Sequence, residues 1–251
     1  MSQVASSSLD DPRPGAPRPG SGAMFDRIAG RYDFLNRLIS LGLDRGWRRH
    51  LVRAVEPKRG GRYLDLATGT ADVALEMLSQ NPGIEAVGLD PSSEMLAIGR
   101  RKVDALGTTG QAIELVEGKA EQLPWDDDHF DGVTISFGIR NVADRPAALA
   151  EMARVTRAGG RVAILEGNEP RGTLLAPFAR FHLHVVIPWI GRLFSGGQEY
   201  RYLQTSIQDF PPADEFAELM GRCGLEVLEV RKLNFGTLCL YVAEPAKGVR
   251  S

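Results

Sequence analysis

Residues 63–78 read YLDLATGTADVALEML, and their order predicts a strand, a turn and a helix in quick succession. The first residues form a short, nearly continuous apolar run, which is typical of a strand buried on both faces of a parallel sheet. A turn follows with Thr68, Gly69 and Thr70 at its centre, and a helical pattern then covers residues 71–80. Gly69 would let the backbone come close to a ligand. Because open α/β sheets bind ligands beyond the carboxyl ends of their strands, this turn is the first candidate ligand site.

The rest of the chain continues the same alternation. We expect helices at 92–106, 146–156 and 213–223, and strands at 84–90, 113–118, 130–139, 160–167, 225–233 and 237–244. Strands separated by helical segments predict an α/β fold with a doubly wound, mostly parallel sheet, here of seven strands. The Asn-Phe-Gly turn between the last two strands predicts a C-terminal antiparallel hairpin.

The flanking segments differ from this core. Residues 1–22 are rich in Ser, Pro and Gly and predict a disordered leader, so the domain is expected to span 23–251. Residues 24–55 predict one or two helices, and residues 170–210 an inserted lid. Within the lid, the apolar and aromatic stretch 174–194 could line a tunnel, lie on a membrane surface or pack as an ordinary helix.

Composition narrows the class of protein. The balance of 30 Lys+Arg against 32 Asp+Glu does not favour a nucleic-acid partner. No apolar run is long enough to cross a bilayer and the N-terminus lacks a signal peptide, so we expect a cytoplasmic protein. Cys223 and Cys239 lack the number and spacing of a disulfide framework or zinc site and are interpreted as buried apolar residues.

Acidic residues at the strand ends predict a nucleoside site. Asp65 lies inside the first strand, and Asp90 ends the second, where a carboxylate can accept both hydroxyls of a ribose. Lys119 and Ala120 follow the third strand and could flank a base. The chain lacks G-x-G-x-x-G, which disfavours a pyrophosphate. Each residue alone could be an ordinary turn or cap residue, but their order on consecutive βα units favours a nucleoside.

Several motifs resemble those of class I S-adenosylmethionine-dependent methyltransferases: LDLATGTADVA, VGLDPSSEML, GKAEQLPWDDDHFDGVTISFGIRNV and EMARVTRAGGRVAILE. Three stretches outside the nucleoside turn narrow the resemblance to the ubiquinone/menaquinone biosynthesis C-methyltransferases: YDFLNRLISLGLDRGW, ISFGIRNV and YRYLQTSIQDFP. The resemblance runs from Met24 to Glu244. It implies a Rossmann-like fold, S-adenosyl-L-methionine as cofactor, and C-methylation of a prenylated quinol, first of all demethylmenaquinol.

The resemblance also implies roles for single residues. Thr70 would contact the methionine or ribose end of the cofactor and Asp90 the ribose. Lys119 and Ala120 would hold the adenine, Ser136 would lie beneath the sulfonium, and Tyr32 would close over the cofactor unless it is a core residue. The chain departs from the family at Lys119, which replaces an Asp or Asn, so that backbone or Glu121 would have to bind the adenine amino group. It also departs at EGN, 166–168, and at Asp44.

The resemblance assigns catalysis to Arg140 and Asn141. Methyl transfer from a sulfonium requires alignment and exclusion of water, and no metal. Arginine is a poor base because it stays protonated, so Arg140 is expected to stabilise a phenolate and Asn141 to hold a water. An ion pair of Arg140 with Asp144 is the alternative. Tyr200, Arg201 and Tyr202 would border the quinol pocket. His50 and His129 show no partner in the sequence, and His182 and His184 are interpreted as pocket or surface residues of the lid.

Other functions stay open at this point. The acceptor could be the benzoquinol of ubiquinone biosynthesis or another phenolic molecule, and the chain could be a non-catalytic scaffold that binds the cofactor. The expected partners are a prenylated quinol and, transiently, the inner membrane surface. The sequence leaves the oligomeric state open.

Overall fold

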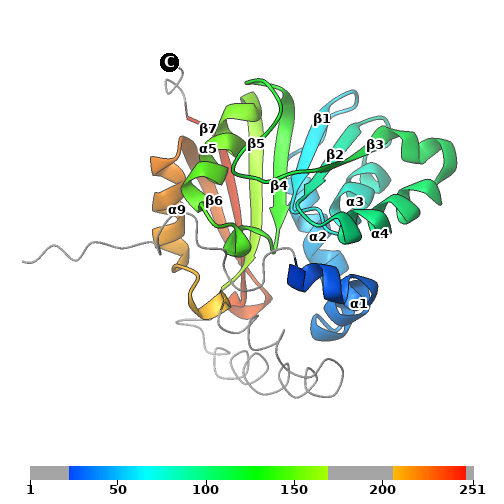
Figure 1. Cartoon of the computed structure of the whole chain (residues 1–251). Helices are drawn as coiled ribbons and strands as arrows, with labels where there is room; N and C mark the ends of the chain where they lie inside the picture. The colour runs from blue at the N-terminus through cyan, green and yellow to red at the C-terminus, as the bar shows by residue number, and fades with distance from the viewer. Residues whose placement is uncertain (1–22, 169–205, 247–251) are drawn as a thin grey trace, which may run out of the picture.

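The structure, a computed structural model, describes residues 23–168 and 206–246. A seven-stranded sheet with the order β3-β2-β1-β4-β5-β7-β6 forms its centre (Figure 1). The first five strands are parallel and β6 and β7 form an antiparallel hairpin, as predicted, and β7 also pairs antiparallel with β5. The strands are β1 (Arg62–Leu66), β2 (Glu85–Asp90), β3 (Ile113–Glu117), β4 (Phe130–Ser136), β5 (Thr156–Gly167), β6 (Leu225–Leu233) and β7 (Leu238–Pro245).

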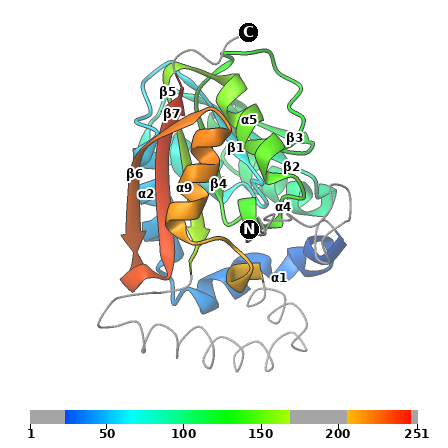
Figure 2. The ribbon, with the colours of Figure 1, turned by 90° about the vertical axis from the view of Figure 1, so that its left-hand side faces the viewer.

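Helices cover both faces of the sheet, which makes it doubly wound. The α-helices of the described residues are α1 (Ala23–Ile39), α2 (Asp44–Ala54), α3 (Asp72–Gln80), α4 (Ser93–Asp104), α5 (Arg145–Val155) and α9 (Ala213–Arg222). One hydrophobic core lies under α5 and α9, and the other lies under α2, α3 and α4. Figure 2 shows α5 and α9 together on one face. Alternate residues of β1 enter the two cores, with Leu64 in the first and Tyr63 in the second.

The N-terminal region forms two helices rather than one. The helical period of α1 ends where Leu41 and Gly42 adopt positive φ, at 52° and 78°. Helix α2 then packs against β5 and α3 through Leu51 and Val52, which are fully buried. Helix α1 instead lies along α4, at the carboxyl ends of the parallel strands (Figure 1).

Several predicted boundaries shift. The strand predicted at 130–139 ends at Ser136 because Phe137 has a φ of 55° and a 3₁₀ turn, Ile139–Asn141, follows. A Cβ atom on Gly138 would stand 2.5 Å from the Cβ of Ala67, so β4 and β1 approach closely there. The strand predicted at 160–167 begins four residues earlier, at Thr156. Ser92 is the N-cap of α4, and its Oγ accepts a hydrogen bond from the backbone N–H of Met95 at 3.2 Å.

Smaller predictions have mixed outcomes. Cys239 is buried as predicted, whereas Cys223 is partly exposed. His129, for which the sequence offered no partner, lies with its Nε2 2.8 Å from Nη1 of Arg62. The expected leader and most of the expected lid lie outside the described residues.

Candidate functional site

The turn between β1 and α3, residues 67–71, has an unusual backbone. Three of its residues have positive φ: 49° at Ala67, 57° at Gly69 and 66° at Ala71. A Cβ atom on Gly69 would stand 3.2 Å from Cε of Met95 and 3.9 Å from a ring carbon of Tyr32. Gly69 is therefore needed both for its conformation and for the space that a side chain would fill.

Asp65 supports this turn from inside the sheet. Its carboxylate accepts hydrogen bonds from Oγ1 of Thr68 at 2.6 Å and from Oγ1 of Thr134 at 2.7 Å. The side chain is 1% exposed. Burial raises the pKa of Asp65 to about 7, although both threonine hydrogen bonds act in the opposite direction. Asp65 therefore holds the turn in place through its hydrogen bond with Thr68.

Asp90 closes the turn from the end of β2. One carboxylate oxygen accepts the backbone N–H of Gly69 at 2.8 Å, and the other accepts the N–H of Ser92 at 2.9 Å. Burial raises the pKa of Asp90, and these two hydrogen bonds oppose the rise. A carboxylate has about four lone-pair sites, so two acceptor positions remain for neighbouring hydroxyl groups. These two acceptor positions fit the hydroxyls of a ribose.

Helix α1 lies across the same turn. Asp26 accepts a hydrogen bond from Oγ of Ser92 at 2.5 Å, and Asp33 accepts one from Oγ1 of Thr70 at 2.7 Å. Between these contacts, the ring of Tyr32 lies near Gly69. Burial raises the pKa of Tyr32, while a hydrogen bond from Asn36 and the positive charge of Arg140 lower it. Tyr32 therefore lies beside Gly69 and close enough to Arg140 to feel its charge.

The third strand end is less well defined as a site. Lys119 is exposed, whereas Ala120 is buried in the core under α5 and α9. Glu121, the proposed substitute for an adenine acceptor, accepts the backbone N–H of Ala143 at 3.2 Å. The backbone N–H of Gly118 binds the carbonyl of Asp90 at 3.1 Å and joins this strand end to β2.

Arg140 lies in the 3₁₀ turn after β4, and it pairs with Glu166 rather than with Asp144, the alternative considered from the sequence. Its Nη1 forms an ion pair with Glu166, which ends β5 and is fully buried. The same carboxylate accepts the backbone N–H of Arg140 at 3.2 Å and that of Gly167 at 2.7 Å. Asp144 instead caps α5 by accepting the backbone N–H of Ala147 at 3.0 Å. Glu166 therefore fixes the guanidinium beside the carboxyl ends of the strands.

The structure thus brings most predicted residues to one edge of the sheet. Ser136 ends β4, half-buried, and Asn141 follows Arg140 with its Nδ2 3.4 Å from the carbonyl oxygen of Phe137. Tyr200, Arg201 and Tyr202 lie outside the described residues, as do His182 and His184. Sequence reasoning missed Glu166 as the partner of Arg140. The signal was an acid at the end of an otherwise apolar strand, VAILEG.

The described residues limit other kinds of site. Across 23–168 and 206–246, no group of three or more His, Cys, Asp or Glu side chains is placed to hold a metal ion. In the same part of the chain, no helix combines the length and apolarity needed to cross a membrane.

Comparisons with known proteins agree on one family. The model of the ubiE/COQ5 methyltransferase family matches residues 19–244. A Geotalea uraniireducens protein, named ubiquinone/menaquinone biosynthesis C-methyltransferase UbiE, is 46% identical over 222 residues, covering 88% of this chain and 94% of that protein. A Thermus thermophilus demethylmenaquinone methyltransferase is 42% identical over 222 residues, covering 88% of this chain and 99% of that protein.

Solved structures share the fold. One chain in the complex of the Haloferax volcanii Trm112 methyltransferase activator with a methyltransferase superimposes with a TM-score of 0.65. It is 20% identical, and the match covers 88% of this chain and 97% of that chain.

Proposed function

Because the chain belongs to the ubiE/COQ5 methyltransferase family, and is thus an S-adenosyl-L-methionine-dependent C-methyltransferase of quinone biosynthesis, we propose that its acceptor is demethylmenaquinol. The Thermus thermophilus relative, a demethylmenaquinone methyltransferase covered over 99% of its length, favours this prenylated naphthoquinol over the benzoquinol. The observation that carries the proposal is the buried Arg140–Glu166 pair beside the β1–α3 turn, where a phenolate can be stabilised.

The cofactor fits the residues of the β1–α3 turn. Asp90 would accept the ribose hydroxyls with its two remaining acceptor positions, and Gly69 leaves open the space that a Cβ would fill. Asp65 would act indirectly, by holding Thr68 and thereby the turn. Thr70 would contact the methionine or ribose end. When bound, S-adenosyl-L-methionine supplies a methyl group on a positively charged sulfur.

The remaining cofactor assignments are less direct. We assign Lys119 and Ala120 to the adenine, through backbone groups, because the Lys119 side chain is exposed. Ser136 would lie under the reacting sulfur, at the end of the strand next to β1. Tyr32 would cover the cofactor from α1, where its ring already lies against Gly69.

Arg140 would stabilise the quinol when it has lost a proton. A ring carbon becomes nucleophilic when an adjacent hydroxyl is deprotonated, and a guanidinium held by a buried carboxylate is oriented to bind the resulting oxyanion. Arg140 stays protonated in this account, so the proton leaves through water that Asn141 would hold. Tyr200, Arg201 and Tyr202 stay proposed neighbours of the quinol ring.

We propose that this protein is cytoplasmic and receives the prenylated quinol at the inner membrane surface. Four exposed large apolar residues lie on α1, the α1–α2 turn and the β6–β7 turn: Phe34, Leu41, Leu43 and Phe235. These elements lie at the same edge of the sheet as the site (Figure 2). Exposed arginines lie near these apolar residues on α1 and α2: Arg37, Arg45, Arg49 and Arg53. Apolar residues flanked by arginines are typical of a surface that binds anionic lipid.

Vesicle sedimentation tests the membrane contact. The full chain should bind vesicles containing phosphatidylglycerol and not vesicles of phosphatidylcholine alone. Serine at both Leu41 and Leu43 should abolish binding, whereas Leu228→Ser, a change of an exposed leucine on β6, should not. Equal binding by the double variant would overturn the assignment of this face.

Turnover with defined quinols tests the acceptor. The protein is incubated with labelled S-adenosyl-L-methionine and, separately, reduced demethylmenaquinone, the corresponding demethylated benzoquinol, and a simple phenol. Preferential labelling of the naphthoquinol supports the proposal. Preference for another acceptor would replace it, and cofactor binding without transfer to any acceptor would indicate a non-catalytic scaffold.

A further inference from the structure

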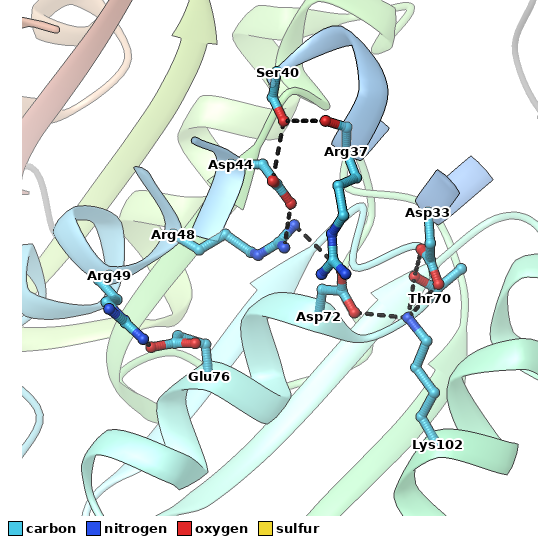
Figure 3. Close-up of polar contacts among 10 residues, drawn as sticks. All are labelled: Asp33, Arg37, Ser40, Asp44, Arg48, Arg49, Thr70, Asp72, Glu76 and Lys102. Atoms are coloured by element: carbon cyan, nitrogen blue, oxygen red, sulfur yellow. Dashed lines mark hydrogen bonds and ion pairs between the residues drawn. The ribbon is translucent and has the colours of Figure 1, made fainter. Parts of the chain in front are cut away.

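Lys102, on α4, joins three separate parts of the site. Its Nζ lies 2.6 Å from Oδ2 of Asp33, 2.6 Å from Oδ1 of Asp72 and 2.9 Å from Oγ1 of Thr70 (Figure 3). The contacts with Asp72 and Thr70 are hydrogen bonds, and the contact with Asp33 is an ion pair. Asp33 belongs to α1, Thr70 to the β1–α3 turn and Asp72 to the first turn of α3.

Two of these partners also bind each other. The hydroxyl of Thr70 donates to Oδ1 of Asp33 at 2.7 Å while its oxygen accepts from Lys102. Lys102, Thr70 and Asp33 therefore form a closed ring of two hydrogen bonds and one ion pair between α4, the turn and α1. Opening any one contact leaves a charge or a hydroxyl hydrogen without that partner.

The ring is anchored on its other side. The second carboxylate oxygen of Asp72 lies 3.2 Å from Nη1 of Arg48, and Nη2 of Arg48 lies 2.5 Å from Asp44 (Figure 3). Asp44 is buried and also accepts a hydrogen bond from Ser40 at 3.0 Å. Because Asp72 and Arg48 belong to α3 and α2, these contacts tie Lys102 to both of those helices as well as to α1.

Helix α1 covers the residues that the cofactor must reach. Thr70 is 2% exposed and Asp90 is 7% exposed in this arrangement. Besides the ring around Lys102, α1 contacts this region through Asp26 on Ser92 and through Tyr32 beside Gly69. These contacts place α1 over the residues on both sides of the Asp90 carboxylate, Gly69 and Ser92.

We propose that Lys102 is a positioning residue for the cofactor: it holds α1 over the β1–α3 turn through Asp33 and Thr70, and the cofactor enters and leaves when that contact opens. This inference rests on the cofactor site described under the proposed function. The Asp33–Lys102 pair suits such a latch because both side chains are partly exposed, so that the contact is weak enough to open and is screened by salt.

The test measures rates of cofactor binding to the immobilised full-length chain by surface plasmon resonance. Lys102→Met keeps an unbranched side chain of similar reach and removes the charge. We expect its association and dissociation rates for S-adenosyl-L-methionine each to rise by roughly tenfold, the effect of losing about one charge-assisted hydrogen bond, with the Kd changed by less than about threefold. Salt should accelerate binding to the unaltered chain more than to the variant.

Matched variants separate the latch from other roles. Arg101→Met removes the neighbouring exposed charge on α4 and should leave both rates unchanged. Lys102→Arg should restore slow exchange, and Asp33→Asn, which keeps an acceptor for Thr70, should accelerate exchange as Lys102→Met does.

Three outcomes would overturn the inference. Unchanged rates in Lys102→Met would show that α1 is not held by this residue. Faster dissociation with unchanged association would show that Lys102 contacts the cofactor directly. Slower association would show that the charge recruits the cofactor. A failure of the unaltered chain to bind S-adenosyl-L-methionine would instead contradict the cofactor site, which distinguishes the two claims.

Discussion

Glu166 and Arg140 form an ion pair at the carboxyl ends of β4 and β5, with the Glu166 side chain fully buried and that of Arg140 9% exposed. A buried pair of this kind is costly to break because the remaining charge is left without compensation. The carboxylate also accepts two backbone N–H groups, from Arg140 and Gly167. Glu166 therefore sets both the position of the guanidinium and the path of the backbone that carries it.

Glu166→Gln tests this positioning role. Glutamine keeps only one of the two acceptor oxygens and removes the charge that orients Arg140, so we expect turnover to fall by roughly tenfold or more while the Kd of the cofactor is unchanged. Glu151→Gln serves as the control, because Glu151 binds Arg154 and the backbone of Leu123 away from the site. Normal turnover in Glu166→Gln would show that the pair has no part in catalysis.

Asp90→Asn tests the ribose assignment. Asparagine preserves the shape of the side chain but halves its acceptor capacity and removes its charge. Calorimetric titration should show a Kd for S-adenosyl-L-methionine raised by roughly 100-fold, equal to about two hydrogen bonds to a charged group. Asp104→Asn, at the exposed end of α4, should bind normally. An unaltered Kd in Asp90→Asn would remove Asp90 from the site.

Asp65 predicts a dependence of stability on pH. Its pKa in the folded protein is about 7, against an ordinary value of 3.8, because the carboxyl is buried. Between these values the folded chain keeps a proton that the unfolded chain has lost, so the free energy of unfolding falls as the pH rises from about 4 to about 7. Below this window the contribution is fully present, and above it the contribution is lost.

Asp65→Asn should remove this dependence. Urea unfolding of both proteins across this range gives the difference in free energy of unfolding, original chain minus variant. That difference should fall by about 4 kcal/mol between the two pKa values, about 1.4 kcal/mol for each pH unit. A difference that stays constant with pH would mean that Asp65 is ionised throughout this range in the folded chain.

Gly138 is expected to tolerate no side chain. A Cβ atom there would approach the Cβ of Ala67 to 2.5 Å, so Gly138→Ala should destabilise the fold by about 1–3 kcal/mol through overpacking. Gly221→Ala is the control, since a Cβ in that position of α9 meets nothing within 4 Å and alanine favours helix by about 0.5–1 kcal/mol. Thermal unfolding compares the two, and a stabilised Gly138→Ala would contradict the close approach.

Local patterns predicted the strands that carry the site. An apolar run that ends near Asp or Gly has few alternatives to a buried strand, and this pattern located β1 and β2. The end of β4 could not be predicted in this way. Phe137 and Ile139 continue the apolar run, and nothing in their identity indicates that Phe137 adopts a positive φ.

Contacts between distant residues were harder still. Arg140 meets Glu166, 26 residues later, because parallel β4 and β5 pair Ser136 with Leu165 and so end side by side. Lys102 follows two other basic residues, Arg100 and Arg101, in the sequence. Only the rotation of α4 about its own axis relative to α1 determines that Lys102 is the one that meets Asp33. The sequence therefore predicted which elements form the site, whereas register and helix packing determine which charges meet there.

The most direct test of the account separates cofactor binding from methyl transfer at Arg140. The double variant Arg140→Gln/Glu166→Gln removes both charges of the buried pair, so that neither is left uncompensated. Single-turnover transfer from saturating labelled S-adenosyl-L-methionine to reduced demethylmenaquinone should slow by roughly 100-fold, as on removal of an oxyanion donor, with the Kd of the cofactor unchanged. An undiminished rate of transfer would contradict the account, because the quinol oxygen would then not depend on Arg140.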